Sequence, residues 1–184
     1  RLATVLANLR RLKEPRVLDA VAPFLDHEDP RVRANAVEVF EELGDAKAIP
    51  LLLPKLHDDH NRVRSNAAKA LGRYQLPEVM ECLKGMLQSD QVRMRESALY
   101  AVTCLREVKA YPLIAPLTQD PYDGIRKRLV RYLANCNTPW AEELLKRMVG
   151  DRDAEIRETA IQALVTRGIP VEGLLQRAAK AASD

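Results

Sequence analysis

The chain has 184 residues, of which 47% are hydrophobic and 30% are charged, and its formal net charge is +3. No apolar run approaches the roughly 18 residues of a membrane-spanning helix, so the composition excludes a membrane span. The apolar share is too high and the net charge too small for a disordered chain. Only 4% of the residues are aromatic, and the apolar residues are mostly Leu, Ala and Val, which favours helices over a β-sandwich.

Three cysteines bear on the compartment of the protein. Cys82, Cys104 and Cys136 are odd in number and have no C-x-x-C spacing, so the sequence indicates neither a disulfide framework nor a thiolate metal site. We interpret each of them as a small hydrophobic core residue. The sequence thus predicts a protein of the reducing cytoplasm, and we expect neither a metal nor another cofactor.

A period of 31 residues runs along the chain, and each full period begins with an apolar residue followed by arginine. The pairs are Val32-Arg33, Val63-Arg64, Met94-Arg95, Ile125-Arg126 and Ile156-Arg157. Each pair opens an apolar stripe at helical spacing, and one further stripe precedes the first pair. The stripes are Val5, Leu6, Leu9 and Leu12; Ala36, Val37, Phe40 and Leu43; Ala67, Ala68 and Leu71; Ala98, Leu99, Val102 and Leu105; Leu129, Val130 and Leu133; and Ala160, Ile161 and Leu164.

Capping signals precede two of these first helices. Asp29-Pro30 and Asp120-Pro121 each place a carboxylate before a proline, just ahead of a stripe. Aspartate is a favoured N-cap, and proline is tolerated in the first helical turn because its missing N–H has no helical partner there. We therefore predict that both aspartates cap a first helix.

A second helix follows in each repeat. Pro50 and Pro112, 62 residues apart, fit the start of such a helix. Further along, Pro23, Pro54, Gly85 and Pro116 occupy one level of the second helix at intervals of 31, and Arg147 occupies that level in the next repeat; these five positions form the breaker column. Proline inside a helix removes a hydrogen bond and bends it, so the column predicts a common kink.

Stacked repeats explain how these helices are stabilised. Two helices in 31 residues cannot bury both apolar faces alone, but stacking makes a continuous core. We predict an all-α solenoid of about six helix pairs in a single domain, residues 1–184, with repeats at approximately 1–28, 29–58, 59–89, 90–119, 120–150 and 151–184. Because Arg1 opens the first helix without a cap or preceding turn, we expect the chain to be a fragment of a longer one.

These repeats resemble HEAT repeats, above all the short bacterial form called the phycobilisome-lyase HEAT-like repeat. The segments DPRVRANAVEVFEELGDAKAIPLLLPKLHD at 29–58 and DAEIRETAIQALVTRG at 153–168 carry the resemblance, which extends over essentially the whole chain. It implies a right-handed curved solenoid whose second helices line the concave side. It also implies scaffold and adaptor functions more often than enzymatic ones.

The arginines of the five pairs form a column that we call the arginine ladder. The resemblance implies a structural role for it, in which each arginine binds acidic residues or helix-end carbonyls of adjacent turns. The acids available in those turns are Asp58, Asp59, Asp90, Asp120 and Asp151. Guanidinium offers five donors in a fixed fork, which suits the joining of consecutive repeats.

The concave side that the resemblance implies is the first candidate binding surface. Its exposed positions have mixed charge and one large aromatic residue, a composition that suits a protein or peptide better than a small molecule. The predicted partner-binding groove residues are Lys47, His57, Lys109, Trp140 and Arg147. The alternative interpretation is that the breaker column only adjusts the curvature of the stack.

A basic edge is the second candidate surface. The candidate anion-binding residues are Arg31, Arg62, Arg93, Lys127, Arg128 and Arg131. They could pair with phosphates or carboxylates without sequence specificity. The alternative is a solvated helix face, because the net charge is small and no aromatic residues interleave for base stacking.

Catalytic chemistry is hard to find in this sequence. His27-Glu28 invites comparison with deoxyhypusine hydroxylase, a HEAT-like enzyme with several His-Glu pairs around two irons, but only one such pair exists here. No nucleophile elbow or phosphate-binding loop is present, and we assign no catalytic residue. The sequence predicts a noncatalytic protein-interaction scaffold or adaptor. The alternatives are a phycobilin-lyase-like chromophore enzyme and a weak, nonspecific nucleic-acid binder; HEAT-like DNA glycosylases add no match beyond the repeat.

Overall fold

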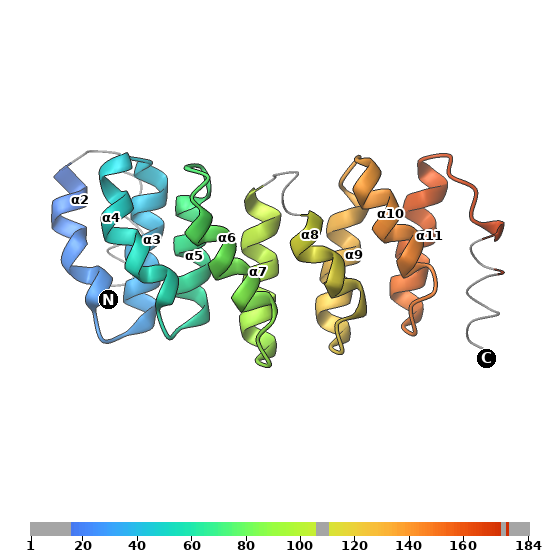
Figure 1. Ribbon diagram of the computed structural model, residues 1–184, viewed down its shortest axis with the longest axis horizontal. Coiled ribbons are helices and arrows are strands. Elements are labelled where there is room, and N and C mark those ends of the chain that lie inside the picture. The colour runs from blue at the N-terminus through green and yellow to red at the C-terminus, as the bar shows by residue number, and fades with distance from the viewer. Residues whose placement is uncertain (1–15, 106–110, 174–175, 177–184) are drawn as a thin grey trace. The chain divides into compact units, whose positions relative to one another are not determined.

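The computed structural model describes residues 16–105, 111–173 and 176 (Figure 1). These residues contain helices and turns and no strand, which confirms the predicted all-α fold. Within the same residues, no helix is both long and apolar enough to cross a membrane. The first predicted stripe and Lys109 lie outside the described residues.

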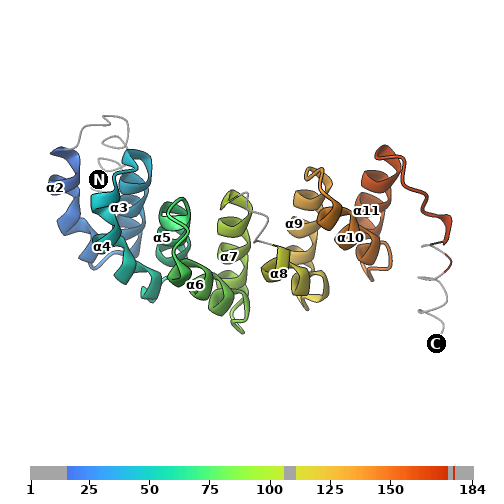
Figure 2. The same ribbon diagram turned by 45° about the horizontal axis from the view of Figure 1, so that its top comes forward.

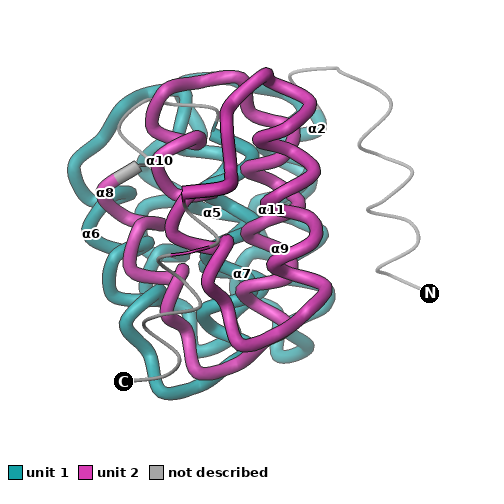
Figure 3. Tube along the Cα trace, turned by 90° about the vertical axis from the view of Figure 1, so that its right-hand side faces the viewer, with its two compact units in different colours: residues 1–110 teal, residues 111–184 magenta. Residues whose placement is uncertain are grey.

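The chain divides into two compact units, residues 1–110 and residues 111–184 (Figure 3). Unit 1 contains α2 (Arg16–Val21), η1 (Ala22–Asp26), α3 (Pro30–Leu43), η2 (Ala46–Ala48), α4 (Ile49–Leu52), η3 (Leu53–His57), α5 (Asn61–Gly72), α6 (Pro77–Leu87) and α7 (Val92–Leu105). Unit 2 contains α8 (Tyr111–Ile114), η5 (Ala115–Gln119), α9 (Asp123–Ala134), α10 (Pro139–Met148) and α11 (Ala154–Thr166).

First and second helices form separate layers within each unit. In unit 1 the first helices α3, α5 and α7 pack side by side, and α6 packs against both α5 and α7 (Figures 1 and 2). In unit 2 the first helices α9 and α11 pack together, and α10 packs against both. The second helices α6 and α10 therefore each contact two successive first helices, which is the packing of an α-solenoid.

The first helices begin at one level of the 31-residue period. Asp29 caps α3 by accepting a hydrogen bond of 2.8 Å from the backbone N–H of Arg31, and Asp153 caps α11 in the same way. The predicted N-cap role of Asp120 is wrong: α9 begins at Asp123, and its N-cap is Tyr122. The physical reason is register, because Asp120 stands two residues before the cap and holds the turn through a 2.9 Å bond from the N–H of Tyr122.

The breaker column changes the helix type where it contains proline. Pro23, Pro54 and Pro116 each lie at the second position of a 3-10 segment that continues a short α-helix. The kink predicted at Gly85 is wrong, because α6 runs without interruption from Pro77 to Leu87. Glycine keeps its N–H, so the helical hydrogen bonds continue through it, whereas proline removes one.

The apolar stripes form the core. Phe40, Leu71 and Leu99 are at most 1% exposed in unit 1, and Leu129 and Leu133 are fully buried in unit 2. Burial of one such side chain stabilises the fold by about 2 kcal/mol. The stripe pattern thus predicted most of the core, but Leu43, Leu105 and Ile161 are only half-buried.

The cysteines differ from the predicted core role. Cys104 is exposed and Cys82 and Cys136 are only half-buried, so the interpretation of all three as core residues is wrong. All three thiols are free. Cys82 on α6 and Cys104 on α7 lie beside the buried columns of their helices, so the helical period places them at the margin of the core, and Cys136 lies in the turn between α9 and α10.

Candidate binding site

The arginine ladder joins each first helix to the turn that precedes it. Arg33 Nη1 donates to the carbonyl oxygens of His27 (3.0 Å) and Glu28 (3.1 Å). Arg126 Nη1 donates to the Asp120 carbonyl at 2.7 Å. Arg95 and Arg157 bind the carbonyls of their own preceding turns in the same way, at 2.8 to 3.1 Å. These bonds satisfy carbonyls where one helix has ended and the next has not begun.

The ladder also joins successive repeats through carboxylates. Arg33 Nε and Nη2 donate to the two carboxylate oxygens of Asp58, each at 2.8 Å, and Nη2 also reaches Asp59. Arg126 makes the same bidentate ion pair with the Asp151 carboxylate, at 2.8 and 3.1 Å. The side chains of Arg126 and Asp151 are only 3% and 4% exposed. The predicted structural role of the ladder is confirmed for these pairs.

The ladder pairs change the pKa values of their members. Burial by itself would raise the pKa of Asp58. Hydrogen bonds from Arg33 and from the backbone N–H of His60 lower the pKa and together outweigh burial, so the pKa of Asp58 lies below its usual value. The hydrogen bond to Asp151 raises the pKa of Arg126 in spite of its burial. Both shifts favour the charged forms of Asp58 and Arg126.

Arg64 departs from this arrangement. Its Nε donates to the carbonyl oxygen of Asp58, whereas Nε of Arg33 and of Arg126 donates to a carboxylate. In the described part of the chain, the Arg64 side chain makes no other hydrogen bond and no ion pair. Its two terminal nitrogens are therefore available as donors.

A hollow of about 450 Å³ lies beside Arg64 in unit 1, and we call it the Arg64 hollow. Its walls come from η3, α5 and α6, and Gly85 leaves one wall without a side chain. The lining residues are Leu56, His57, Arg64, Pro77, Glu78, Glu81, Cys82, Gly85 and Met86. Burial raises the pKa of the Cys82 thiol to about 11, and that thiol donates to the carbonyl of Leu56. The thiol is therefore neutral and unreactive at neutral pH.

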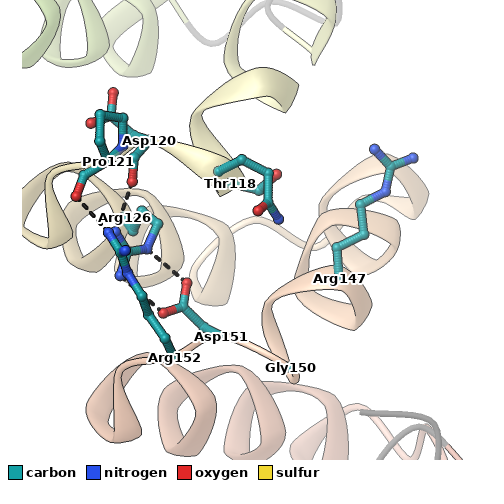
Figure 4. Close-up of a pocket in the computed structure, with 9 residues that line it drawn as sticks. Thr118, Asp120, Pro121, Arg126, Arg147, Gly150, Asp151 and Arg152 are labelled. Carbon is teal, nitrogen blue, oxygen red and sulfur yellow. Dashed lines mark hydrogen bonds and ion pairs between the residues drawn. The ribbon is translucent and has the colours of Figure 1, made fainter. Parts of the chain in front are cut away.

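A second hollow of about 420 Å³ lies in unit 2, and we call it the Arg126 hollow (Figure 4). It is lined by Thr118, Gln119, Asp120, Pro121, Arg126, Arg147, Gly150, Asp151 and Arg152. Figure 4 shows the Arg126 guanidinium joined to Asp151, with Arg147 on the far side of the hollow. Arg152 crosses to the carbonyl of Pro121 at 2.6 Å. Polar groups that already have partners thus occupy much of this hollow.

The predicted groove residues separate between the two units. His57 lines the Arg64 hollow, and Arg147 lines the Arg126 hollow and pairs weakly with Glu143 at 3.4 Å. Lys47 is exposed in η2 and lines neither hollow. Trp140 is half-buried on α10 and lies against Tyr132, with ring centroids 6.4 Å apart.

The predicted anion-binding edge is also divided, and most of its side chains have acidic partners. Arg62 pairs with Glu38 at 2.9 Å, and Arg31 is close to Asp29 at 3.7 Å. In unit 2, Lys127 contacts Asp123, Asp153 and Glu155, and Arg131 also pairs with Glu155. Hydrogen bonds to Asp153 and Glu155 raise the pKa of Lys127. Among the described residues, Arg93 and Arg128 have no such ion pair.

Sequence reasoning missed the residues that distinguish the Arg64 hollow. The sequence placed Arg64 in the structural ladder, Cys82 in the core and Gly85 in the breaker column, and gave no sign that these residues and Met86 line one hollow. A signal for Arg64 alone was present in the sequence. Aspartate recurs at one level of the 31-residue period, at Asp58, Asp120 and Asp151. Ser89, 31 residues after Asp58, occupies the same level. In the part of the chain that the structure describes, no group of three or more His, Cys, Asp or Glu side chains could hold a metal ion.

Comparisons with known proteins agree with this architecture. The family model for HEAT repeats matches residues 1–59, 18–103 and 111–184. The structure of the complex of CpcE and CpcF of phycocyanin lyase from Nostoc sp. PCC7120 contains a similar chain, with a TM-score of 0.55 and 25% identity over 88% of this chain and 68% of that one. The comparison with curated protein sequences gives no match.

Two designed proteins share the fold. An engineered protein has a TM-score of 0.52 and 15% identity, covering 96% of this chain and 89% of its own. A computationally designed armadillo repeat protein for modular peptide recognition has a TM-score of 0.52 and 18% identity, with 89% of each chain covered. The stacked helix pairs and the arginine ladder define an α-solenoid repeat protein. The chain belongs to the HEAT repeat family.

Proposed function

We propose that the chain is a noncatalytic, cytoplasmic scaffold that binds a partner protein through its second-helix face, with the Arg64 hollow as the contact in unit 1. The fold supports this proposal, because stacked repeats offer an extended surface whereas an active site needs convergent titratable groups. The observation on which it rests is the Arg64 hollow itself. Leu56, Cys82 and Met86 provide apolar lining, and the charged groups of Arg64 and Glu81 border it.

This combination is typical of protein recognition. A partly apolar depression gives an anchor side chain a desolvated place, while charged groups around it supply orientation. The basic edge is a weaker candidate, because an incoming phosphate would compete with the acids that already pair with Arg62, Lys127 and Arg131. We therefore place the second-helix face first.

Site-specific photo-crosslinking tests this proposal. A photo-reactive amino acid replaces Glu81 at the Arg64 hollow in one variant and Arg93 on the first-helix edge in another. The full chain is expressed in cells that naturally contain it, and adducts are identified by mass spectrometry. We expect a protein adduct from position 81 and none from position 93. Adducts from position 93 alone would place the partner on the basic edge, and no adduct from either position would contradict the scaffold function.

A phycobilin-lyase-like role is the second candidate. The similarity to a chain of the CpcE and CpcF complex, 25% identity over 88% of this chain, favours it. Incubation of the purified chain with phycocyanobilin, followed by absorption spectroscopy and mass spectrometry, separates the two functions. A noncatalytic scaffold leaves the bilin spectrum unchanged, whereas a bound or altered bilin would favour the lyase-like role.

Nucleic-acid binding is the third candidate, and its test is salt dependence. If the basic edge contacts phosphates, affinity for labelled duplex DNA falls with added salt, with a log–log slope of roughly −0.9 per phosphate. The triple variant Arg31→Glu, Arg62→Glu, Arg93→Glu should then lose binding. Unchanged binding by this variant would exclude the unit 1 part of the edge.

A further inference from the structure

Two ladder arginines, Arg64 and Arg157, have no carboxylate 25 residues further along the chain. Arg33 binds Asp58 and Arg126 binds Asp151, and in both pairs the acid stands 25 residues after the arginine. The residue 25 positions after Arg64 is Ser89, whose hydroxyl cannot supply a charge. Asp90 follows Ser89 as Asp59 follows Asp58, but it is exposed and makes no ion pair with Arg64.

The guanidinium group of Arg64 takes a different position from those of other ladder arginines. Nε of Arg64 binds the Asp58 carbonyl, at the level that Nη1 binds in Arg33, Arg126 and Arg157. Both terminal nitrogens of Arg64 are then without a hydrogen-bond partner in the described chain, and the residue lines the hollow. A guanidinium with two free donors matches the two oxygens of one carboxylate.

The surroundings of Arg64 restrict what can bind there. Leu56, Cys82 and Met86 make part of the lining apolar, and the Cys82 thiol is neutral. Glu78 and Glu81 are exposed at the hollow. These two carboxylates repel a run of negative charges, so a polyanion such as nucleic acid fits poorly. A single carboxylate beside an apolar group matches a lining that combines the Arg64 guanidinium with apolar side chains.

We propose that the Arg64 hollow binds an acidic side chain, Asp or Glu, of a partner polypeptide, flanked by an apolar residue. The partner's carboxylate takes the place that Asp58 and Asp151 take at the other ladder arginines. The apolar neighbour packs on the apolar lining, whose Leu56 and Met86 are each 1% exposed, and Gly85 leaves room for the backbone to approach. This inference rests on the proposed scaffold function and names the chemistry of its partner.

The chain offers a matched pair of variants at Ser89. Ser89 Oγ accepts from the N–H of Gln91 at 3.2 Å, and Asp58 and Asp151 accept from the equivalent N–H groups at 2.9 Å. The turn therefore accommodates an aspartate at position 89. Ser89→Asp restores the internal carboxylate and occupies Arg64 without removing any lining residue. Ser89→Asn has the same size and no charge, so it serves as the control.

The assay uses the full chain and a random dodecapeptide library displayed on phage. Selected peptides are synthesised with a fluorescent label, and their affinities for wild type, Ser89→Asp and Ser89→Asn are measured by fluorescence polarisation. Each peptide is also made with its acidic residue changed to the corresponding amide. Circular dichroism checks that the variants fold. Capped glutamate as a free small molecule serves as a competitor.

We expect the selected peptides to contain an acidic residue next to an apolar one. Ser89→Asp and the amide peptide should each weaken binding about tenfold or more, while Ser89→Asn stays within about threefold of wild type. Equal binding to wild type and Ser89→Asp, or selected peptides without a carboxylate, would overturn the inference. So would capped glutamate that competes as well as the whole peptide, because the ligand would then be a small acid.

The photo-crosslinking experiment separates failure of the inference from failure of the proposed function. If position 81 still captures a protein in Ser89→Asp, the second-helix face binds a partner but Arg64 is not its anchor, and only the inference fails. If neither peptides nor adducts are obtained, both fail.

Discussion

The Arg64 hollow and the Arg126 hollow occupy the same level of the repeat, 62 residues apart, and differ in what holds their ladder arginine. Asp151 binds Arg126 through two hydrogen bonds, and both side chains are almost completely buried. At the equivalent level Ser89 leaves Arg64 without a carboxylate. The comparison teaches that Asp151 joins Arg126 to the next repeat, whereas Arg64, with Ser89 at that level, keeps two donors for a ligand.

The breaker column adds to the difference. Gly85 leaves the wall of the Arg64 hollow open, since a Cβ there would meet nothing within 4 Å. At the equivalent level Arg147 places a charged side chain at the edge of the Arg126 hollow. The first hollow is therefore partly apolar and has a free donor in its lining, whereas charged groups that have partners line much of the second.

The largest expected effect comes from making the second hollow resemble the first. Asp151→Ser removes the counter-charge of an arginine that is 3% exposed, and we expect the free energy of unfolding to fall by about 3 kcal/mol. Urea denaturation followed by circular dichroism measures it. Asp59→Ser is the control, because that carboxylate is 90% exposed and should contribute less than about 0.5 kcal/mol. A similar small change in both variants would refute the structural role of the buried pair.

A smaller effect, which depends on pH, is expected at Asp58. Its pKa in the folded protein is lowered, so its contribution is fully present above the unfolded pKa of about 3.9 and is lost as the pH falls through the folded value. Asp58→Asn should therefore destabilise the chain by about 2 kcal/mol at neutral pH. The difference from wild type should close in strong acid. Unfolding curves between neutral pH and strong acid measure this, and a constant difference would contradict it.

Restoring the missing carboxylate should have the opposite sign. Ser89→Asp gives Arg64 an internal partner in a half-buried position, and we expect stabilisation by about 1 kcal/mol at neutral pH. The gain should disappear in Arg64→Gln, which keeps a polar side chain without the charge. A gain of equal size in that background would show that the new aspartate acts on the turn and not on Arg64.

The smallest expected effect concerns the breaker column. Gly85 lies inside α6, and Gly85→Ala should stabilise the helix by about 0.8 kcal/mol, because alanine loses less backbone entropy on folding. Gly44→Ala is the contrasting control. Its φ of +63° disfavours a side chain, and the new Cβ would lie 2.3 Å from Arg73 Nη1. Thermal denaturation compares the two variants. If both were more stable than wild type, the backbone conformation at each glycine would not decide the effect of the substitution.

Much of the fold could be predicted from single residues and their spacing. The 31-residue period located the first helices, and their apolar stripes matched buried positions such as Phe40 and Leu129. Two local signals misled. Asp120-Pro121 looked like a cap but lies ahead of it, and Gly85 looked like a proline equivalent but keeps its helical hydrogen bonds. Asp120 is the right residue type for an N-cap but stands two residues too early, and Gly85 shares its level with prolines but not their missing N–H.

The sequence by itself determined the repeat, the helices and the ladder, because helical periodicity and proline chemistry act between residues close along the chain. It did not show that Arg64 differs from Arg33 and Arg126 in the direction of its donors. Only the tertiary structure decided that, since the acids that bind Arg33 and Arg126 lie in the turn of the next repeat, 25 residues away. Whether two such groups meet depends on packing between repeats. At Arg64, where Ser89 stands at that level, Nε binds a carbonyl and two donors remain beside a hollow.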